Sequence, residues 1–440
     1  MKNVLEHKLF LIFIVLFPLC ISINSWAGGS TEQQIEELKM RLEEVMRQSQ
    51  QQIEALRGRI EELEAKQEKM PEKMKEGWWD NVEVGYKKGA FIKMKDESWA
   101  LKFNTRLQFR FFVEDFDDER DKDTKASFQL RRARLYLSGH GFFPWLKYKI
   151  QIQGDKGSSL GLKDYYLDFA YYKEATPRIG QFKLPFNAEE LTSSSALQFV
   201  DRSIVNSEFA LSRDIGVMLH GKVLGDLFHY GAGIFNGGGR NIKENADDDF
   251  LFVGRVAFTP FGYFQYQQAH LEKHSDKMLL RIGAAIAGLP GFEPDKETTS
   301  DRKNLGNAVA DIGSAKADVV QFSADAVFKW MRFSIEAEYD LRNIYPEEGG
   351  IGDVTAHGFR VQAGYLIIPK HLEVAFRYAF LDPDDDRSND RIQEFTPAIS
   401  YYVRGHRLKV QADYTIFLED NPDGDDFMDN IFKLQMQFYF

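Results

Sequence analysis

The 440-residue chain has little of what two common protein classes need. It contains a single cysteine, Cys20, and its mean hydropathy is −0.40, with 56 Lys and Arg against 67 Asp and Glu for a formal charge of −11. It lacks the several apolar runs of about 20 residues that a polytopic helical membrane protein requires. A transmembrane β-barrel is not excluded, because a barrel strand needs apolar residues only on its lipid side. Aromatic residues are plentiful, with 37 Phe and 18 Tyr, and barrels use aromatic girdles at the membrane interfaces.

The N-terminus has the features of a targeting segment. Lys2 and Lys8 precede an apolar run at residues 9–19, and Ser25 and Ala27 offer small side chains for cleavage before Gly28. We interpret residues 1–27 as a secretory signal peptide; the alternative is a single transmembrane anchor. Removing this segment removes Cys20, so the mature chain has no thiol for a disulfide, a metal or nucleophilic chemistry.

The next segment, residues 28–76, has the periodicity of a helix with one apolar face. Pro71 ends the pattern, and we predict a periplasmic coiled coil here, followed by a linker at 77–97; the alternative is a lone solvated helix. Isoleucine at the first seam position and leucine at the second favour a dimer in isolation. The residues at 3–4 spacing are Ile35, Leu38, Leu42, Val45, Ile53, Leu56, Ile60, Leu63 and Met70.

From Ser98 onward the period changes to two. Apolar residues occupy the odd positions from Trp99 to Val113, and polar or cationic residues alternate with them. The same alternation recurs to the C-terminus and gives 17 candidate strands. Since a closed barrel with both ends on one side needs an even number, we demote the weakest candidate, Tyr263–His270, to a turn. The prediction is an all-β transmembrane barrel of 16 antiparallel strands over residues 98–440, and its last strand ends on the aromatic Phe440, as assembly signals of outer-membrane barrels do.

The connections between these strands alternate in length. This segregation is typical of outer-membrane barrels, which have long extracellular loops and short periplasmic turns. The long connections are 115–126, 154–161, 184–212, 237–248, 288–317, 343–354, 382–389 and 419–428, and the short ones are 140–144, 173–176, 225–226, 330–331, 368–370 and 404–406.

Several motifs resemble the phosphate-selective porin O and P family. The resemblance covers roughly residue 98 to the C-terminus and implies a homotrimer of 16-stranded barrels, each with a channel narrowed by its third long loop, here 184–212. The motifs are Leu130–Leu135, Leu162–Leu167, Gly180–Phe186, Glu189–Ser194, Gly233–Gly237 and Glu394–Thr396.

The resemblance also implies site residues. The adjacent arginines of the second strand match Arg131 and Arg132, the Thr-Ser-Ser of the constriction loop matches Thr192, Ser193 and Ser194, and a lysine of the third strand matches Lys147. Fixed cations and hydroxyl donors of this kind replace part of an anion's hydration. The chain departs from the family where lysines flank the Thr-Ser-Ser, because Glu190 and Ser195 stand there. We expect this departure to weaken phosphate binding.

Charges on the predicted lumen side lean cationic in the first half of the barrel. Seven cations on three neighbouring strands face two carboxylates, Asp164 and Asp168; the alternative reading is ordinary solvation of a polar interior. The cations are Lys102, Arg106, Arg110, Arg132, Arg134, Lys147 and Lys149. The candidate pore-lining or anion-binding set is Arg106, Arg110, Arg131, Arg132, Arg134, Lys147, Asp164, Ser193 and Ser194, with Glu190 and Ser195 as residues that alter selectivity.

We therefore predict a porin in the outer membrane of a Gram-negative bacterium, with a water-filled channel for small hydrophilic solutes and a modest anion preference, phosphate being one candidate. The alternatives are a weakly selective general porin and a structural barrel tethered to the periplasm by its coiled coil. Expected partners are outer-membrane lipid and lipopolysaccharide, small anionic or polar solutes, peptidoglycan through the coiled coil, and further copies of the chain, with no nucleic acid. No cofactor or metal is expected: the Asp-rich loops offer oxygen ligands of the kind calcium takes, and a calcium site there is the alternative, but they lack the spacing of an EF-hand and we interpret them as solvated. No enzymatic motif is recognisable, although a barrel enzyme such as a phospholipase would draw its residues from distant positions.

Overall fold

The computed structural model describes residues 31–68, 78–120, 122–156, 159–245, 248–272, 276–293, 312, 315–421 and 424–440. The predicted signal peptide lies outside these residues. The chain divides into two units, residues 1–80 and 81–440. Within the described ranges, no helix is both long and apolar enough to cross a membrane.

The first unit contains helix α2 (Thr31–Glu68). Its apolar seam is uncovered: Ile35, Ile53 and Leu56 are 49%, 49% and 63% exposed. Exposed ion pairs one turn apart, such as Arg41 with Glu37 at 2.9 Å, lie outside the seam. The predicted helix is confirmed, and its association into a coiled coil stays a prediction.

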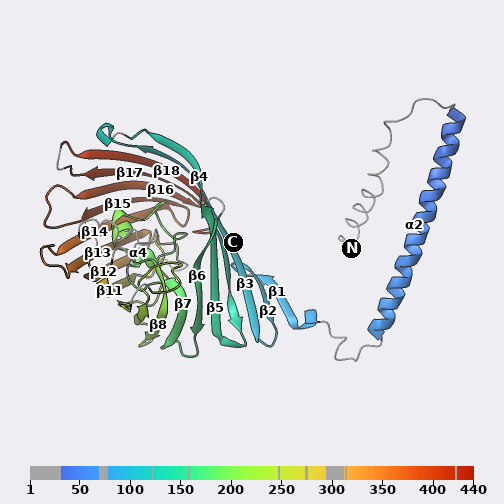
Figure 1. Ribbon diagram of the computed structural model, residues 1–440, viewed down its shortest axis with the longest axis horizontal. Coiled ribbons are helices and arrows are strands. Elements are labelled where there is room, and N and C mark those ends of the chain that lie inside the picture. Colours follow the sequence, from blue (N-terminus) through green and yellow to red (C-terminus); the bar gives the residue numbers. More distant parts are fainter. Residues whose placement is uncertain are drawn as a thin grey trace. The chain divides into compact units, whose positions relative to one another are not determined.

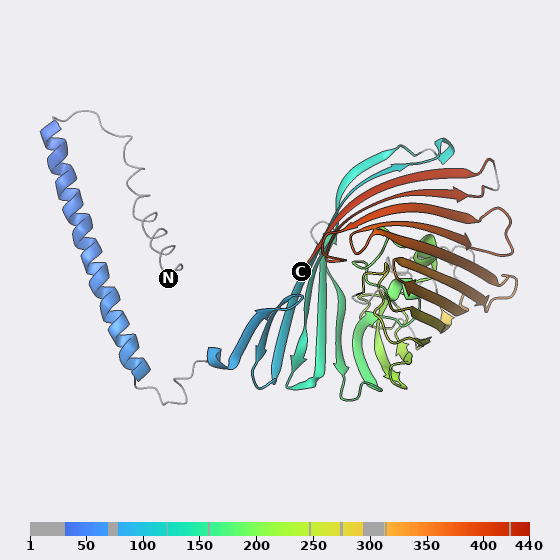
Figure 2. The same cartoon turned by 180° about the vertical axis from the view of Figure 1, so that it is seen from behind.

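The second unit is a closed antiparallel barrel (Figures 1 and 2). Each strand pairs with the next along the chain, and the last strand pairs with the first through the register Phe432↔Val113, which closes the ring and confirms the 16-strand prediction. The strands are β3 (Trp99–Asp115), β4 (Lys125–Gly141), β5 (Phe143–Lys156), β6 (Ser159–Phe169), β7 (Thr176–Lys183), β8 (Arg213–Val223), β9 (Phe228–Phe235), β10 (Leu251–Phe258), β11 (Leu279–Phe292), β12 (Ala317–Trp330), β13 (Phe333–Pro346), β14 (Val354–Ile368), β15 (Leu372–Asp382), β16 (Ile392–Tyr402), β17 (Leu408–Glu419) and β18 (Phe427–Tyr439).

The burial pattern is the reverse of that in a water-soluble protein. Along β3, Arg106 and Gln108 are 1% and 0% exposed, whereas Leu107 and Phe109 are 44% and 52% exposed. The polar residues lie inside the ring and the apolar residues face outward, as the alternation predicts. This arrangement suits a barrel surrounded by hydrocarbon.

Residues 77–97, predicted as a linker, contain two further strands. The hairpin of β1 (Val82–Tyr86) and β2 (Ala90–Met94) turns at Lys88 and Gly89, both with positive φ, and β2 pairs with the start of β3. The two strands have five residues each, too few for the alternation to stand out from its surroundings.

Two connections test the predicted loop pattern. The long loop predicted at 154–161 is wrong, because β5 continues to Lys156 and β6 begins at Ser159. The demotion of Tyr263–His270 is confirmed, since these residues form no strand. They belong to the connection between β10 and β11, at the end of the barrel where the other connections are short turns. Phe264, Ala269 and His270 are 5%, 0% and 1% exposed, so this connection folds into the barrel.

Candidate functional site

The connection between β7 and β8 folds into the barrel (Figures 1 and 2). We call residues 184–212 the inward loop. It contains two short helices, α4 (Ala188–Leu191) and α5 (Ile204–Phe209), and the Ser203 hydroxyl caps the second by accepting a hydrogen bond from the backbone N–H of Asn206.

One side of the inward loop is packed tightly against the barrel wall formed by β13 to β17. The Glu189 carboxylate lies 3.1 Å from Arg360 Nε and 3.9 Å from Arg377 Nη1, and Lys409 Nζ donates to the Leu197 carbonyl at 2.7 Å. Val205 and Phe209 pack in an apolar cluster with residues of β14 and β15. This half of the lumen is therefore occupied by side chains.

The other side of the inward loop borders a cavity of about 350 Å³. We call it the basic cavity, because six cationic side chains and two carboxylates line it. Its lining comes from the inward loop, from the consecutive strands β4 to β8, and from Tyr439 of β18. The lining residues are Arg134, Tyr136, Lys149, Gln151, Asp164, Tyr166, Arg178, Phe182, Lys183, Glu190, Leu191, Ser193, Ser194, Arg202, Arg213 and Tyr439.

Both carboxylates of the basic cavity are held by cations. Asp164 accepts from Lys149 Nζ and from Arg213 Nε, each at 2.6 Å. Glu190 lies 3.1 Å from Arg202 Nη1, 3.3 Å from Lys183 Nζ and 3.8 Å from Arg213 Nη1. Burial alone would raise the pKa of Glu190, but the surrounding Arg202, Lys183 and Arg213 outweigh burial and lower the pKa to about 2. The carboxylate is therefore ionised and neutralised by its neighbours.

Two arginines, Arg106 and Arg134, lie beside the inward loop. Arg106 and Arg134 are directly opposite each other in the register of β3 and β4. Arg106 Nη1 lies 3.4 Å from Ser193 Oγ, and Arg134 Nη1 lies 3.3 Å from Ser194 Oγ. Among the described residues neither arginine forms an ion pair, and the Nε and Nη2 atoms of Arg106 are buried without a hydrogen-bond partner. Like charges placed directly opposite each other repel, so the pair carries concentrated positive charge next to two serine hydroxyls.

The arginines matched by the resemblance lie against the inward loop instead. A β-bulge makes this possible: Arg132 pairs with Gln108 and Leu130 with Phe109, so Arg131 is the extra residue. Arg131 Nε and Arg132 Nη2 then both approach Asp201 Oδ1, at 3.8 Å and 3.9 Å.

Asp201 also forms ion pairs with two further cations, Arg110 and Lys433. Arg110 Nη2 lies 2.9 Å from its Oδ1 and Lys433 Nζ lies 3.5 Å from its Oδ2. Burial would raise the pKa of Asp201, but the four cations outweigh burial and hold it well below its ordinary value. Arg110, Arg131 and Arg132 therefore anchor the loop.

Two other predicted site residues, Ser195 and Lys147, lie in different places. Ser195 Oγ lies 2.9 Å from Ser193 Oγ and Ser195 is buried in the loop. Lys147 is exposed and lies outside the lining of the basic cavity, whereas Lys149, two residues further along β5, lines it.

Sequence reasoning missed Arg178, Lys183, Arg202 and Arg213 as lining residues. Arg213 shares parity with the outward-facing Val217 and Leu219, so alternation alone places it on the lipid side. The preceding Ser212 has a left-handed φ of 56°, and Arg213 is the first residue after this irregular turn. Its role depends on how the loop leaves the lumen, which a strand pattern does not encode.

The segment between β10 and β11 meets the inward loop inside the barrel. Gln268 N–H donates to the Ala196 carbonyl, and Gln198 N–H donates to Gln268 Oε1, each at 2.8 Å. Lys329 Nζ donates to the carbonyls of Gln267 and Ala269 at 2.6 Å and 2.8 Å. The lumen is thus narrowed from both rims.

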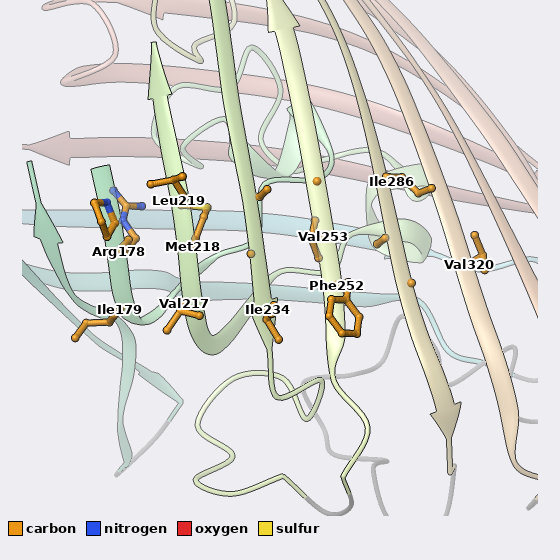
Figure 3. A pocket seen from close by; sticks show the side chains of 16 residues that line it. Arg178, Ile179, Val217, Met218, Leu219, Ile234, Phe252, Val253, Ile286 and Val320 are labelled. Carbon is orange, nitrogen blue, oxygen red and sulfur yellow. The ribbon is translucent and has the colours of Figure 1, made fainter. Parts of the chain in front are cut away.

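A larger hollow lies on the outer face of the barrel. It measures about 960 Å³ and spans β7 to β12, with the exposed side chains Ile179, Val217, Ile234 and Phe252 around it (Figure 3). Glycines and alanines such as Gly233 and Ala287 also line it. Its lining is mostly apolar, and it also includes Arg178, which lines the basic cavity as well.

Comparisons with known proteins agree with this geometry. An uncharacterized protein of Aquifex aeolicus is 25% identical over 384 residues, covering 77% of this chain and 87% of its own length, and Porin O of Pseudomonas aeruginosa is 21% identical over 361 residues, covering 76% and 78%. The fold is shared with the anion-selective porin from Comamonas acidovorans, with a TM-score of 0.54 and 11% identity over 78% of this chain and 100% of that one. It is also shared with the outer-membrane channel DcaP of Acinetobacter baumannii, with a TM-score of 0.52 and 14% identity over 79% of this chain and 99% of that one. A family model described as phosphate-selective porin O and P matches residues 103–440. The chain therefore belongs to the phosphate-selective porin O and P family, and it is an outer-membrane porin.

Proposed function

We propose that this porin conducts small anions in modest preference to cations through the basic cavity. The observation that carries the proposal is the opposed pair of Arg106 and Arg134, which form no ion pair with any described residue and whose guanidinium groups lie beside Ser193 and Ser194. Guanidinium and hydroxyl donors suit oxyanions and halide ions alike, and fixed charges at a narrow point select by sign.

We expect no site that binds phosphate specifically. A site that selects phosphate needs several free donors converging on one point, whereas Lys149, Lys183, Arg202 and Arg213 are each engaged by Asp164 or Glu190. A bound phosphate would compete with these carboxylates for the same donors. We therefore expect chloride and phosphate to cross with similar ease.

We also propose that the protein assembles as a trimer, with α2 in the periplasm. The support for the trimer comes from the OmpT of Vibrio cholerae, described as a trimer form, which shares the fold (TM-score 0.51, 13% identity, covering 78% of this chain and 100% of that one). The exposed seam of α2 supports association with further copies or contact with peptidoglycan. Acidic long loops would meet lipopolysaccharide through divalent ions.

The experiment that tests the function is conductance of single channels in planar bilayers. Phosphate added to a chloride bath should reduce the current only in proportion to its lower mobility. A block at micromolar phosphate would show a specific phosphate site. Absence of any conductance would favour the alternative, a structural barrel tethered by α2. Equal permeability of anions and cations would favour the general porin.

A further inference from the structure

The rim that carries the long loops holds a group of potential metal ligands outside the channel. An imidazole nitrogen of His357 and one carboxylate oxygen each of Asp382 and Asp385 lie within 4.8 Å of one another. His357 is near the start of β14 and is paired in register with Asp382, the last residue of β15, while Asp385 follows in the connecting loop. Two adjacent strands and one loop therefore bring three ligands to one point.

This group lies on the outer face of the barrel. His357 shares its side of β14 with Phe359 and Val361, while the alternate residues Ala356 and Arg360 are buried in the lumen. Its ring centroid is 5.9 Å from that of Phe380 and 6.3 Å from that of Tyr339. The group therefore lies next to aromatic side chains on the outer face, opposite the lumen-facing residues of β14.

A second observation points to a missing positive partner. Asp382 is only 3% exposed, yet this carboxylate is incompletely satisfied. Its Oδ2 accepts from Arg391 Nε at 3.0 Å, while its Oδ1 is buried and has no hydrogen-bond partner among the described residues. A buried carboxylate oxygen that receives no hydrogen bond is poorly stabilised, and a bound cation would supply the missing interaction.

The charge of the surrounding loop is also uncompensated. Residues 382–391 contain five aspartates and two arginines. Arg391 forms an ion pair with Asp382 at 3.0 Å, and Arg387 forms one with Asp384 at 3.1 Å. Asp385, which is 43% exposed, contacts His357 Nδ1 through its Oδ1 at 2.6 Å.

We propose that His357, Asp382 and Asp385 bind a divalent transition-metal ion, with zinc as its representative, which fastens loop 383–391 to the ends of β14 and β15. One imidazole with two carboxylates matches the donors that zinc accepts, whereas calcium and magnesium take oxygen ligands. Ligands at about 2.1 Å from a tetrahedral zinc lie roughly 3.4 Å apart. The 2.6 Å contact between His357 and Asp385 therefore opens slightly on binding, and the exposed Asp385 has the freedom to move.

Zinc titration of the intact, untagged, detergent-solubilised protein after dialysis against a chelator tests this site. Calorimetry should show one zinc ion per chain, and His357→Ala and Asp385→Asn should each weaken binding at least about tenfold. Asp386→Asn is the matched control, because it removes the same charge from a neighbouring exposed residue, and it should leave the affinity unchanged. Equal loss in all three variants, or in none, overturns the site and shows diffuse attraction to an acidic loop.

Two further readouts separate the site from a simple histidine–aspartate ion pair. Cobalt substituted for zinc should give visible absorption bands that disappear in His357→Ala. Binding of calcium without zinc would overturn the assignment, because it would show that the imidazole takes no part. Heat-modifiable mobility on gels confirms that each variant keeps the folded barrel.

Discussion

Arg106 and Arg134 stand directly opposite each other across β3 and β4, and each guanidinium reaches a different serine of the inward loop. The pair joins the barrel wall to the inward loop. The strands β3 and β4 supply the two charges, and the loop limits the space in which a solute can pass them. Asp164, Asp168 and Glu190 form ion pairs with the other cations nearby, so the pair adds positive charge that is not engaged in such a contact among the described residues.

Replacing these arginines should reduce anion preference. A unit charge about 5 Å from a permeating ion is worth about 0.8 kcal/mol in water, a factor of about 4 in relative permeability. We expect Arg106→Gln and Arg134→Gln each to lower the anion-to-cation permeability ratio by about this factor, measured from reversal potentials in a potassium chloride gradient. Lys147→Gln is the control, because Lys147 is exposed, whereas Arg106 and Arg134 both reach serines of the inward loop. An equal effect of Lys147→Gln would contradict the assignment.

Asp201→Asn should shift selectivity in the opposite direction. Asp201 is the one carboxylate that Arg110, Arg131, Arg132 and Lys433 share in these ion pairs, so its removal takes away one negative charge from this cluster and releases part of the inward loop. We expect a several-fold higher anion preference together with noisier single-channel currents. Asp118→Asn, in an exposed outer loop, makes the same charge change away from the lumen. A shift toward cations would show that Asp201 does not anchor those side chains.

Glu190 should stabilise the inward loop in a manner that depends on pH. Its pKa is lowered from 4.5 to about 2, so its contribution is fully present above pH 4.5 and is lost as the pH falls toward 2. At 1.36 kcal/mol per unit, the contribution is on the order of 3 kcal/mol. Urea unfolding in lipid vesicles should show Glu190→Gln less stable than wild type at neutral pH, with the difference shrinking below pH 4.5. The exposed Glu174→Gln should show no such difference, and a Glu190→Gln deficit that persists at pH 2 would refute the mechanism.

Glu190→Lys follows from the same contacts. A lysine there would place four cations, with Lys183, Arg202 and Arg213, around one point that now holds a carboxylate. We expect a less stable inward loop rather than a simple gain of phosphate binding. A stable variant with a new phosphate block would show instead that Glu190 alone suppresses phosphate selectivity.

The sequence was sufficient for the barrel because alternation of period two repeats over long strands such as β3, where Arg106 and Leu107 face opposite sides. Parity of the strand count also rejected Tyr263–His270 correctly. Alternation could not reveal the bulge at Arg131 that lets Arg131 and Arg132 both approach Asp201, because two consecutive polar residues do not by themselves show that one of them is unpaired in the ladder. Nor could it show that Glu190 is surrounded by Lys183, Arg202 and Arg213, since these contacts depend on the path of the inward loop.

Deletion of residues 31–70 tests what α2 contributes. Because the barrel offers a far larger surface for association than one exposed helical seam, we expect trimers to persist on native gels without α2. Monomers in the deletion variant, with trimers in the full-length chain, would show that the coiled coil is required for assembly.

The reversal potential of the wild-type channel in a tenfold potassium chloride gradient tests the central claim most directly. We expect a potential on the anion side of zero, because Arg106 and Arg134 place positive charge beside Ser193 and Ser194 of the inward loop. A reversal potential on the cation side would contradict it.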